Sequence, residues 1–215
     1  MRAVIFDLDG TLINSLPTIT NAANALLAEN GQPPVTDELT VHFVGLGERV
    51  FMERLIAATA LNTRDFDPLT HRFVEYYQEF AKVTPLMPFV SEVLTDLGDA
   101  GFALGLCTNK PRAPLATTLA AAGLDKAFKV EVAGDDLPKR KPNPDPLIEA
   151  ARRLESDQFI YVGDSEIDAE TARNAGVPFA FFTEGIRTTD IADIPFDASF
   201  DDFRDLPEIC DRLLA

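Results

Sequence analysis

Two aspartates near the start of the chain, Asp7 and Asp9, come at the end of a short apolar run, residues 4–6. Such a run is typical of a buried strand that enters a loop. Side chains two residues apart point the same way on an extended backbone, and neighbouring carboxylates repel each other unless a cation or a proton lies between them. The pair is therefore a candidate site for Mg²⁺-assisted chemistry. The alternative is a strand that ends in a polar turn, which Asp and Gly favour.

Polar residues follow other apolar runs in the same way. Thr108 and Asn109 end a later run, Lys141 precedes a helix-like segment, and Asp164 and Asp168 follow another run. Taken singly, Thr108, Asn109 and Asp164 suit loop starts or helix caps, and Lys141 suits an exposed lysine. The ends of parallel strands meet at one rim of a sheet, however. Their co-occurrence therefore favours a site for phosphate and metal.

The strand and helix patterns predict the scaffold that would bring these residues together. Short apolar runs alternate with helical periodicity from residue 102 onward, after a helical pattern at residues 90–100, which predicts an α/β fold with a doubly wound parallel sheet. The expected strands are residues 103–108, 129–133, 159–163 and 179–183. The expected helices are residues 90–100, 113–122 and 146–154.

The segment from residue 15 to residue 84 shows helical periodicity and no convincing strand. Its expected helices are residues 19–29, 49–60 and 70–81, with breaks at residues 31–34 and 65–68. We therefore expect a helical domain, residues 15–84, inserted after the first strand of a core made of residues 1–14 and 85–215. The aromatic residues of this segment at helical spacing, Tyr77 among them, are expected in its core.

Bulk composition restricts the partners and the compartment. The formal net charge of −16 over 215 residues argues against nucleic acid and anionic membrane surfaces as partners. No apolar run is long enough to span a membrane, and the first strand begins too early to leave room for a signal peptide. Cys107 and Cys210 are far apart and have no metal-ligand spacing. We expect free thiols and a cytoplasmic location.

The four polar segments together resemble the haloacid dehalogenase superfamily, and the resemblance covers essentially the whole chain because the helical insertion is similar in position to the family's cap domain. The matching motifs are Asp7-Leu8-Asp9-Gly10-Thr11-Leu12, Thr108-Asn109, Lys141-Pro142 and Gly163-Asp164-Ser165-Glu166-Ile167-Asp168. Within the superfamily, Thr108-Asn109-Lys110-Pro111 and the residues after Lys141 look most like the phosphoglycolate phosphatases.

The resemblance implies roles for the acidic residues. Asp7 would be the nucleophile and form an aspartyl-phosphate. Asp9 would protonate the leaving alkoxide and then deprotonate the hydrolytic water. Mg²⁺ would bind Asp7, the backbone carbonyl of Asp9, and Asp164. Asp168 would support the metal shell or orient Lys141.

The resemblance also implies which groups bind the substrate. Thr108 and Lys141 would contact the phosphoryl oxygens, and the turn at Gly10 would present backbone N–H groups to the phosphate. Asn109, with Lys110, would line the entrance. Residues 45–49 form the expected substrate loop of the cap, in which Arg49 binds a substrate carboxylate or is an ordinary surface arginine.

The expected function is that of a Mg²⁺-dependent phosphatase for a small-molecule phosphate ester, with phosphoglycolate as the best guess, in a monomer or a homodimer. Phosphatases for a sugar phosphate, a nucleotide or pyrophosphate are alternatives, as is a phosphosugar mutase similar to β-phosphoglucomutase. Asp9 argues against dehalogenases, which lack this acid. A phosphorylated receiver domain would be much shorter, and an inactive partner-binding relative would not need the intact Asp7 and Lys141.

Overall fold

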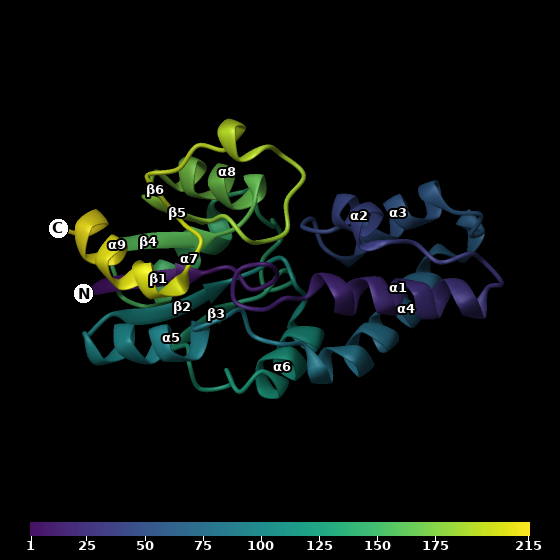
Figure 1. Cartoon of the computed structure of the whole chain (residues 1–215), viewed down its shortest axis with the longest axis horizontal. Coiled ribbons are helices and arrows are strands. Elements are labelled where there is room, and N and C mark those ends of the chain that lie inside the picture. The colour runs from purple at the N-terminus through teal and green to yellow at the C-terminus, as the bar shows by residue number, and fades with distance from the viewer.

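A six-stranded parallel sheet and a separate group of helices make up the protein, whose computed structural model describes all 215 residues (Figure 1). Neighbouring strands run in the order β3-β2-β1-β4-β5-β6, and every pair is parallel. The strands are β1 (Arg2–Phe6), β2 (Ala103–Cys107), β3 (Val130–Val132), β4 (Gln158–Gly163), β5 (Phe179–Phe182) and β6 (Ala198–Phe200). Five of them were predicted, and β6 was missed.

Helices cover both faces of the sheet because its strands carry apolar side chains on both sides. Val4 and Phe6 of β1 point into one core cluster, and Ala3 and Ile5 point into the other. The first face packs against α5 (Val90–Asp99), α6 (Arg112–Ala121) and α9 (Leu206–Leu213). The second packs against α7 (Asp145–Arg153) and α8 (Glu166–Ala175). The prediction of a doubly wound parallel sheet is confirmed.

The chain between β1 and α5 forms the helical insertion, which we define as residues 16–83. It contains α1 (Leu16–Glu29), α2 (Asp37–Thr40), α3 (Glu48–Ala58) and α4 (Phe66–Phe80), joined in part by single turns of 3₁₀ helix. A core cluster of 16 buried residues holds it together, and the rings of Phe51 and Phe73 stack at its centre with centroids 4.5 Å apart.

The start of α4 differs from the expectation. Residues 65–68 were predicted as a break, yet the helix begins at Phe66 and takes Pro68 into its first turn. Proline is tolerated there because the N–H groups of the first turn have no partner within the helix. Propensity alone therefore misplaced this boundary by one turn.

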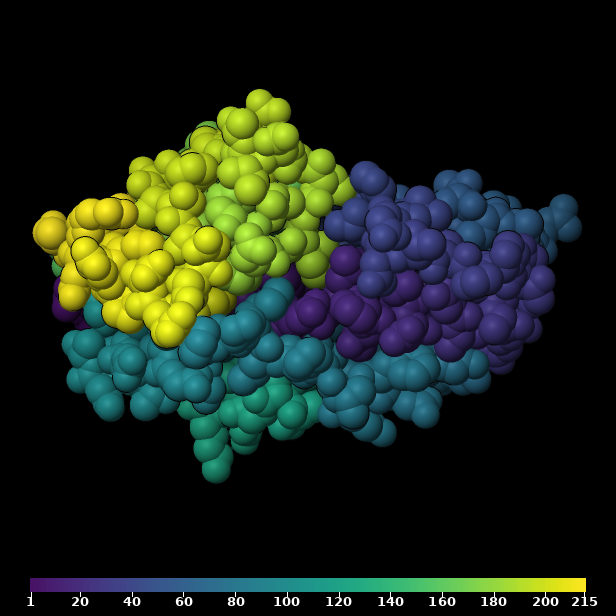
Figure 2. Space-filling view, viewed as in Figure 1, coloured from purple at the N-terminus to yellow at the C-terminus, as the bar shows by residue number.

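Two chain crossings connect the helical insertion to the sheet. The amide of Asn14 donates to the carbonyl of Pro85, and the amide of Met87 donates to the carbonyl of Leu12, each over 2.9 Å. The insertion lies beyond the carboxyl ends of the strands, and both chain termini lie at the opposite end of the sheet (Figure 1). In the space-filling view it packs in purple and blue beside green and yellow-green residues of the sheet core, while the yellow C-terminal residues lie at the far end (Figure 2).

Two further observations concern compartment and partners. Cys107 and Cys210 are both buried and unpaired, as expected. No helix of the structure combines the length and the apolar character needed to cross a membrane.

Candidate active site

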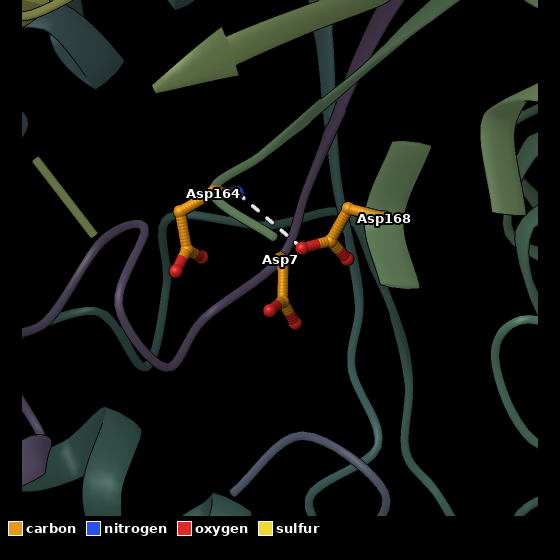
Figure 3. Close-up of side chains that lie close together, drawn as sticks. All are labelled: Asp7, Asp164 and Asp168. Atoms are coloured by element: carbon orange, nitrogen blue, oxygen red, sulfur yellow. Dashed lines mark hydrogen bonds between the residues drawn. The ribbon is translucent and has the colours of Figure 1, made fainter. Parts of the chain in front are cut away.

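Three buried aspartates meet at the carboxyl ends of β1 and β4 (Figure 3). Asp7 follows β1 and Asp164 follows β4, while Asp168 lies in the first turn of α8. One carboxylate oxygen from each lies within 4.8 Å of the others. The strand order reverses direction between β1 and β4, which is where open α/β sheets place their ligands.

Asp7 carries a buried oxygen that accepts no hydrogen bond. Its Oδ1 lies 2.8 Å from Nζ of Lys141, in ion-pair contact but without the geometry of a hydrogen bond. Burial raises the pKa of Asp7 to about 6, and the charges of Asp168 and Asp9 act in the same direction against the opposing effect of Lys141. The ionised form of Asp7 therefore needs more positive charge than Lys141 supplies.

Asp164 is held by two donors from distant segments. The Thr11 hydroxyl donates to its Oδ1, and the amide of Ile186 donates to its Oδ2 over 2.6 Å. Burial and the charges of Asp168 and Asp7 nevertheless raise the pKa of Asp164 well above its usual range. Gly10, with φ of 86°, lets the backbone pass close by, since a Cβ there would lie 2.3 Å from Oδ2 of Asp164.

The cluster of Asp7, Asp164 and Asp168 fits a divalent cation. Three carboxylates face one ammonium group, that of Lys141, and Oδ1 of Asp7 lacks a hydrogen-bond donor. Carboxylate oxygens are the ligands that Mg²⁺ prefers. Asp7 and Asp164 keep lone pairs for such an ion, whereas the oxygens of Asp168 are occupied.

The carboxylate of Asp168 holds the ammonium group of Lys141 in place. Its Oδ1 accepts from Nζ of Lys141 over 2.8 Å and from the Tyr161 hydroxyl over 3.0 Å. Its Oδ2 accepts from the Ser165 hydroxyl over 2.6 Å and from the amide of Asp164, which Figure 3 draws as a dashed line. Ser165 and Asp168 also form a capping box that begins α8. Of its two expected roles, the geometry favours the orientation of Lys141.

Lys141 is buried at the base of the site, so the interpretation as an exposed lysine is wrong. Its side chain is 2 % exposed, and Nζ also donates to the Tyr161 hydroxyl over 2.7 Å. Burial by itself would lower the pKa of Lys141, but the carboxylates of Asp168 and Asp7 outweigh it and raise that pKa. Lys141 is therefore a charged group held in a fixed place.

Asn109 supports Lys141 from the loop after β2. Its Oδ1 accepts from the amide of Lys141 over 2.9 Å, and its Nδ2 donates to the carbonyls of Lys141 and Gly45 over 3.0 and 2.9 Å. Asn109 lines the pocket together with Lys110, and its amide group is bonded to protein. Thr108 beside it lines the pocket, and its hydroxyl accepts from the amide of Lys110 while donating to no protein group.

The turn after β1 also corrects an expectation. The amide of Gly10 donates to the carbonyl of Ile13, and that of Thr11 donates to the carbonyl of Leu8, so neither faces a ligand. The amides of Leu8 and Asp9 donate to no protein acceptor. These two amides are the ones that the turn leaves for an anion.

Asp9 lies in a second charged group that reasoning from the sequence missed. Its Oδ2 lies 2.9 Å from Nζ of Lys110, and its Oδ1 accepts from the Tyr77 hydroxyl at 3.4 Å. Lys110 Nζ also contacts the Tyr77 hydroxyl. Burial and then the charge of Asp9 raise the pKa of Tyr77 to about 12. The ring of Tyr77 lies in the core as expected, but a tyrosine among phenylalanines signals a polar end that needs a partner.

These groups line one pocket of about 540 Å³ between the sheet and the helical insertion. Asp7, Asp9 and Lys141 form its polar base, and the insertion supplies an apolar wall. The wall residues include Ile19, Val44, Leu46, Phe51 and Phe73.

The expected substrate loop contributes most of its residues to the pocket. Residues 45–48 line the pocket, but Arg49 does not. Its exposed side chain lies 3.6 Å from Glu53 and packs over the ring of Phe66, so of its two expected roles the geometry favours an ordinary surface arginine. Two other arginines line the pocket. Arg54 donates to the carbonyl of His42, and Arg187 donates to the carbonyl of Thr183.

Comparison with known proteins gives a consistent picture. A family model described as haloacid dehalogenase-like hydrolase matches residues 4–182. A protein of Cereibacter sphaeroides named phosphoglycolate phosphatase is 40% identical over 218 residues, which cover 100% of both chains. One of Rhodobacter capsulatus with the same name is 39% identical and covers 96% of this chain and 95% of the relative.

A solved structure is similar over nearly its full length. The crystal structure of a predicted phosphoglycolate phosphatase from Haemophilus somnus superposes with a TM-score of 0.91 and 32% identity, and 96% of each chain is covered. The sheet and the helical insertion described above are thus both present in that relative.

Proposed function

Because the chain belongs to the haloacid dehalogenase-like hydrolases, we propose that it is a Mg²⁺-dependent phosphatase that hydrolyses a small-molecule phosphate monoester through an aspartyl-phosphate, with phosphoglycolate as its substrate. The observation that carries the reaction class is Asp7, a buried carboxylate with an oxygen free of hydrogen bonds beside Lys141 and Asp164. The names of the relatives support the substrate.

Asp7 is the nucleophile of the first step. Its carboxylate attacks phosphorus, the bond from phosphorus to the ester oxygen breaks, and an aspartyl-phosphate forms. Asp9 donates a proton to the leaving alkoxide oxygen. In the second step Asp9 takes a proton from water, whose oxygen attacks phosphorus and releases phosphate from Asp7. Both aspartates return to their starting states.

The surrounding groups stabilise the negative charge of the transferred phosphoryl group. Lys141, the Thr108 hydroxyl and the amides of Leu8 and Asp9 supply donors that need no rearrangement. Asp7, Asp164 and the backbone carbonyl of Asp9 would hold Mg²⁺, which when bound neutralises carboxylate charge so that an anionic phosphate can approach. Asp168 keeps Lys141 in place for this role.

The helical insertion, residues 15–84 in the domain division expected from the sequence, acts as a cap. Its apolar wall covers the polar base of the pocket and excludes water while the ester bond breaks. Substrates enter when the cap moves away from the sheet core.

The test is phosphate release with Mg²⁺ from phosphoglycolate, a sugar phosphate, a nucleotide and pyrophosphate, ranked by kcat/KM. We expect phosphoglycolate to rank first and EDTA to abolish its turnover. Asp7→Asn should lower kcat by at least about 10³-fold, and full activity of that variant would overturn the mechanism. If phosphoglycolate ranks far below another ester, the substrate is wrong and the reaction class stands. Transfer of phosphate to a sugar in place of water would instead favour the mutase alternative.

A further inference from the structure

Lys110 is a buried cation that the mechanism above leaves without a task. Its side chain is 5% exposed, and it lines the same pocket as Asp7 and Asp9. Its Nζ lies 2.9 Å from Oδ2 of Asp9 and contacts the Tyr77 hydroxyl. No other cationic side chain forms an ion pair with Asp9.

We propose that Lys110 binds an anionic group on the carbon next to the substrate's leaving oxygen, so that a carboxylate of the leaving group is recognised there. The inference rests on the proposed function, because it takes Asp9 as the residue that faces the leaving oxygen. Recognition of that carboxylate by Lys110 would define the substrate class as phosphate esters of 2-hydroxy acids. Phosphoglycolate is the smallest member of this class.

The reach of the groups supports this assignment. A proton donor lies about 2.6–3.2 Å from the oxygen that it protonates. Since Nζ of Lys110 lies 2.9 Å from Oδ2 of Asp9, it lies within about 6 Å of a leaving oxygen that contacts this Oδ2. In phosphoglycolate one carbon separates that oxygen from the carboxylate, whose oxygens lie about 3 Å away. The distance that remains between the substrate's carboxylate oxygen and Nζ of Lys110 suits a charge-assisted hydrogen bond of about 2.8 Å.

Lys110 has the capacity for this contact. An ammonium group has three donors, and Asp9 and Tyr77 occupy two of them. The third is available to a ligand in the pocket. A substrate with a neutral leaving group would leave this buried donor without an acceptor. A site with an unpaired buried donor favours strongly the substrate that supplies the acceptor over the one that lacks it.

The other cations of the pocket are less suited to the leaving group. Lys141 contacts Asp7 and Asp168, and so belongs to the phosphoryl side. Arg54 and Arg187 each donate to a backbone carbonyl, and neither contacts Asp9. Arg54 is the competing carboxylate site that an experiment has to separate from Lys110.

Tyr77 brings the cap into this arrangement as a positioning residue. It lies on α4 of the helical insertion, while Lys110 belongs to the loop after β2. Tyr77→Phe would keep the ring in its core and remove only the hydroxyl that contacts Lys110. We expect that variant to weaken the preference for a carboxylate less than loss of Lys110 does.

The experiment compares kcat/KM for phosphoglycolate and for 2-hydroxyethyl phosphate, in which a hydroxymethyl group replaces the carboxylate. Wild type should prefer phosphoglycolate. Lys110→Met should lower that preference by about 100-fold. Lys110→Arg should restore part of it, and Arg54→Met should leave the preference unchanged. Thermal unfolding of each variant shows that it is folded, and Lys110→Gln replaces Lys110→Met if the latter is not.

Three results would overturn the inference while the phosphatase reaction stands. In the first, Lys110→Met slows both substrates by the same factor, so Lys110 only holds Asp9. In the second, Arg54→Met removes the preference. In the third, wild type hydrolyses both esters equally well.

Release of phosphate from neither ester would instead contradict the proposed function. Titration calorimetry of both esters against Asp7→Asn then decides the inference separately. Tighter binding of phosphoglycolate that Lys110→Met abolishes would support it, and equal binding of the two esters would overturn it.

Discussion

The side-chain amide of Asn109 donates a hydrogen bond of 2.9 Å to the carbonyl of Gly45, and this bond joins the sheet core to the pocket loop of the helical insertion. The same side chain accepts from the amide of Lys141 and donates to its carbonyl. One residue therefore holds both the pocket loop and the lysine at its base, so we expect movement of that loop to be coupled to the position of Lys141.

Asn109→Ala is expected to raise KM and lower kcat, because both the loop and Lys141 lose a fixed contact. It should also lower the free energy of unfolding by about 1–3 kcal/mol, since the buried amide of Lys141 loses its acceptor. Asn24→Ala is the matched control, because Asn24 makes the same pair of bonds to the backbone of Val35 inside the insertion. Steady-state kinetics and urea unfolding are the measurements. Equal kinetic effects of the two variants would contradict the coupling.

Asp168→Asn is expected to lower kcat by about 100-fold, because Lys141 loses the carboxylate that holds it. The variant should lose about 3 kcal/mol of stability, the cost of breaking one buried ion pair. Ser165→Ala removes the cap of α8 and one donor to Oδ2 of Asp168 but keeps the bond between Oδ1 of Asp168 and Lys141, so it should cost about 1 kcal/mol with a much smaller loss of kcat. A kcat for Asp168→Asn close to that of Ser165→Ala would show that Asp168 is only a helix cap.

Stabilisation by Mg²⁺ is expected to increase with pH. The folded pKa of Asp7, about 6, exceeds its usual value of 3.8, so the metal-free folded chain binds this proton more tightly than the unfolded chain. The stability that this proton contributes is fully present below about pH 4 and is lost as pH rises through about 6. Mg²⁺ needs the ionised carboxylate, so proton and metal compete.

Differential scanning fluorimetry with and without Mg²⁺ measures this effect. The rise in Tm should be about 5 °C or more at pH 7.5 and much smaller at pH 5. Asp7→Asn should reduce the difference between the two pH values, and the remainder belongs to Asp164, whose pKa is raised as well. A rise that is equal at both pH values, or larger at pH 5, would contradict the assignment of Asp7 as a ligand.

Gly45→Ala is expected to raise KM by about tenfold. Gly45 has φ of 105°, which strains any other residue, and a Cβ there would lie 2.7 Å from Cδ1 of Ile167, so the loop or the tip of Ile167 would have to shift. Gly31→Ala is the control for backbone strain alone, because Gly31 has φ of 65° and open space around it. Both variants should lose about 1 kcal/mol of stability. An unchanged KM for Gly45→Ala would mean that the loop does not touch substrate.

Arg49→Ala is expected to leave kcat/KM within about twofold of wild type, because the side chain lies outside the pocket. Its exposed ion pair with Glu53, one helical turn away, contributes about 0.3–0.5 kcal/mol to stability. A loss of kcat/KM for phosphoglycolate alone would return Arg49 to the carboxylate site. Parallel assays of phosphoglycolate and 2-hydroxyethyl phosphate make that distinction.

Much of the fold follows from local patterns. The strands from β1 to β5 were predictable because each is an apolar run that a buried parallel strand requires. β6, Ala198–Phe200, was missed because three residues are too few to show a period. The start of α4 was misplaced because proline ends most helical patterns, although the first turn accepts it.

Some residues of the candidate site were predictable from the sequence, and others were not. Asp7, Asp9 and Asp164 were predicted as site residues because they follow apolar runs. Lys141 was predicted from its co-occurrence with them and from the motifs that resemble a known family. Tyr77 and Lys110 were missed as a pair, because their contact joins residues 33 positions apart on two different structural units. No local pattern contains that information.

The sequence by itself thus accounts for the reaction class, because Asp7, Asp9 and Asp164 follow apolar runs that a parallel sheet brings to one rim, and because the four motifs that include Lys141 resemble a known hydrolase family. Only the tertiary structure decided which charged side chains contact one another. It buried Lys141 between Asp7 and Asp168, turned Arg49 outward and brought Lys110 to Asp9. The physical reason is that the energy of a charge depends on its burial and on neighbours within a few ångströms, which packing sets and spacing along the chain does not.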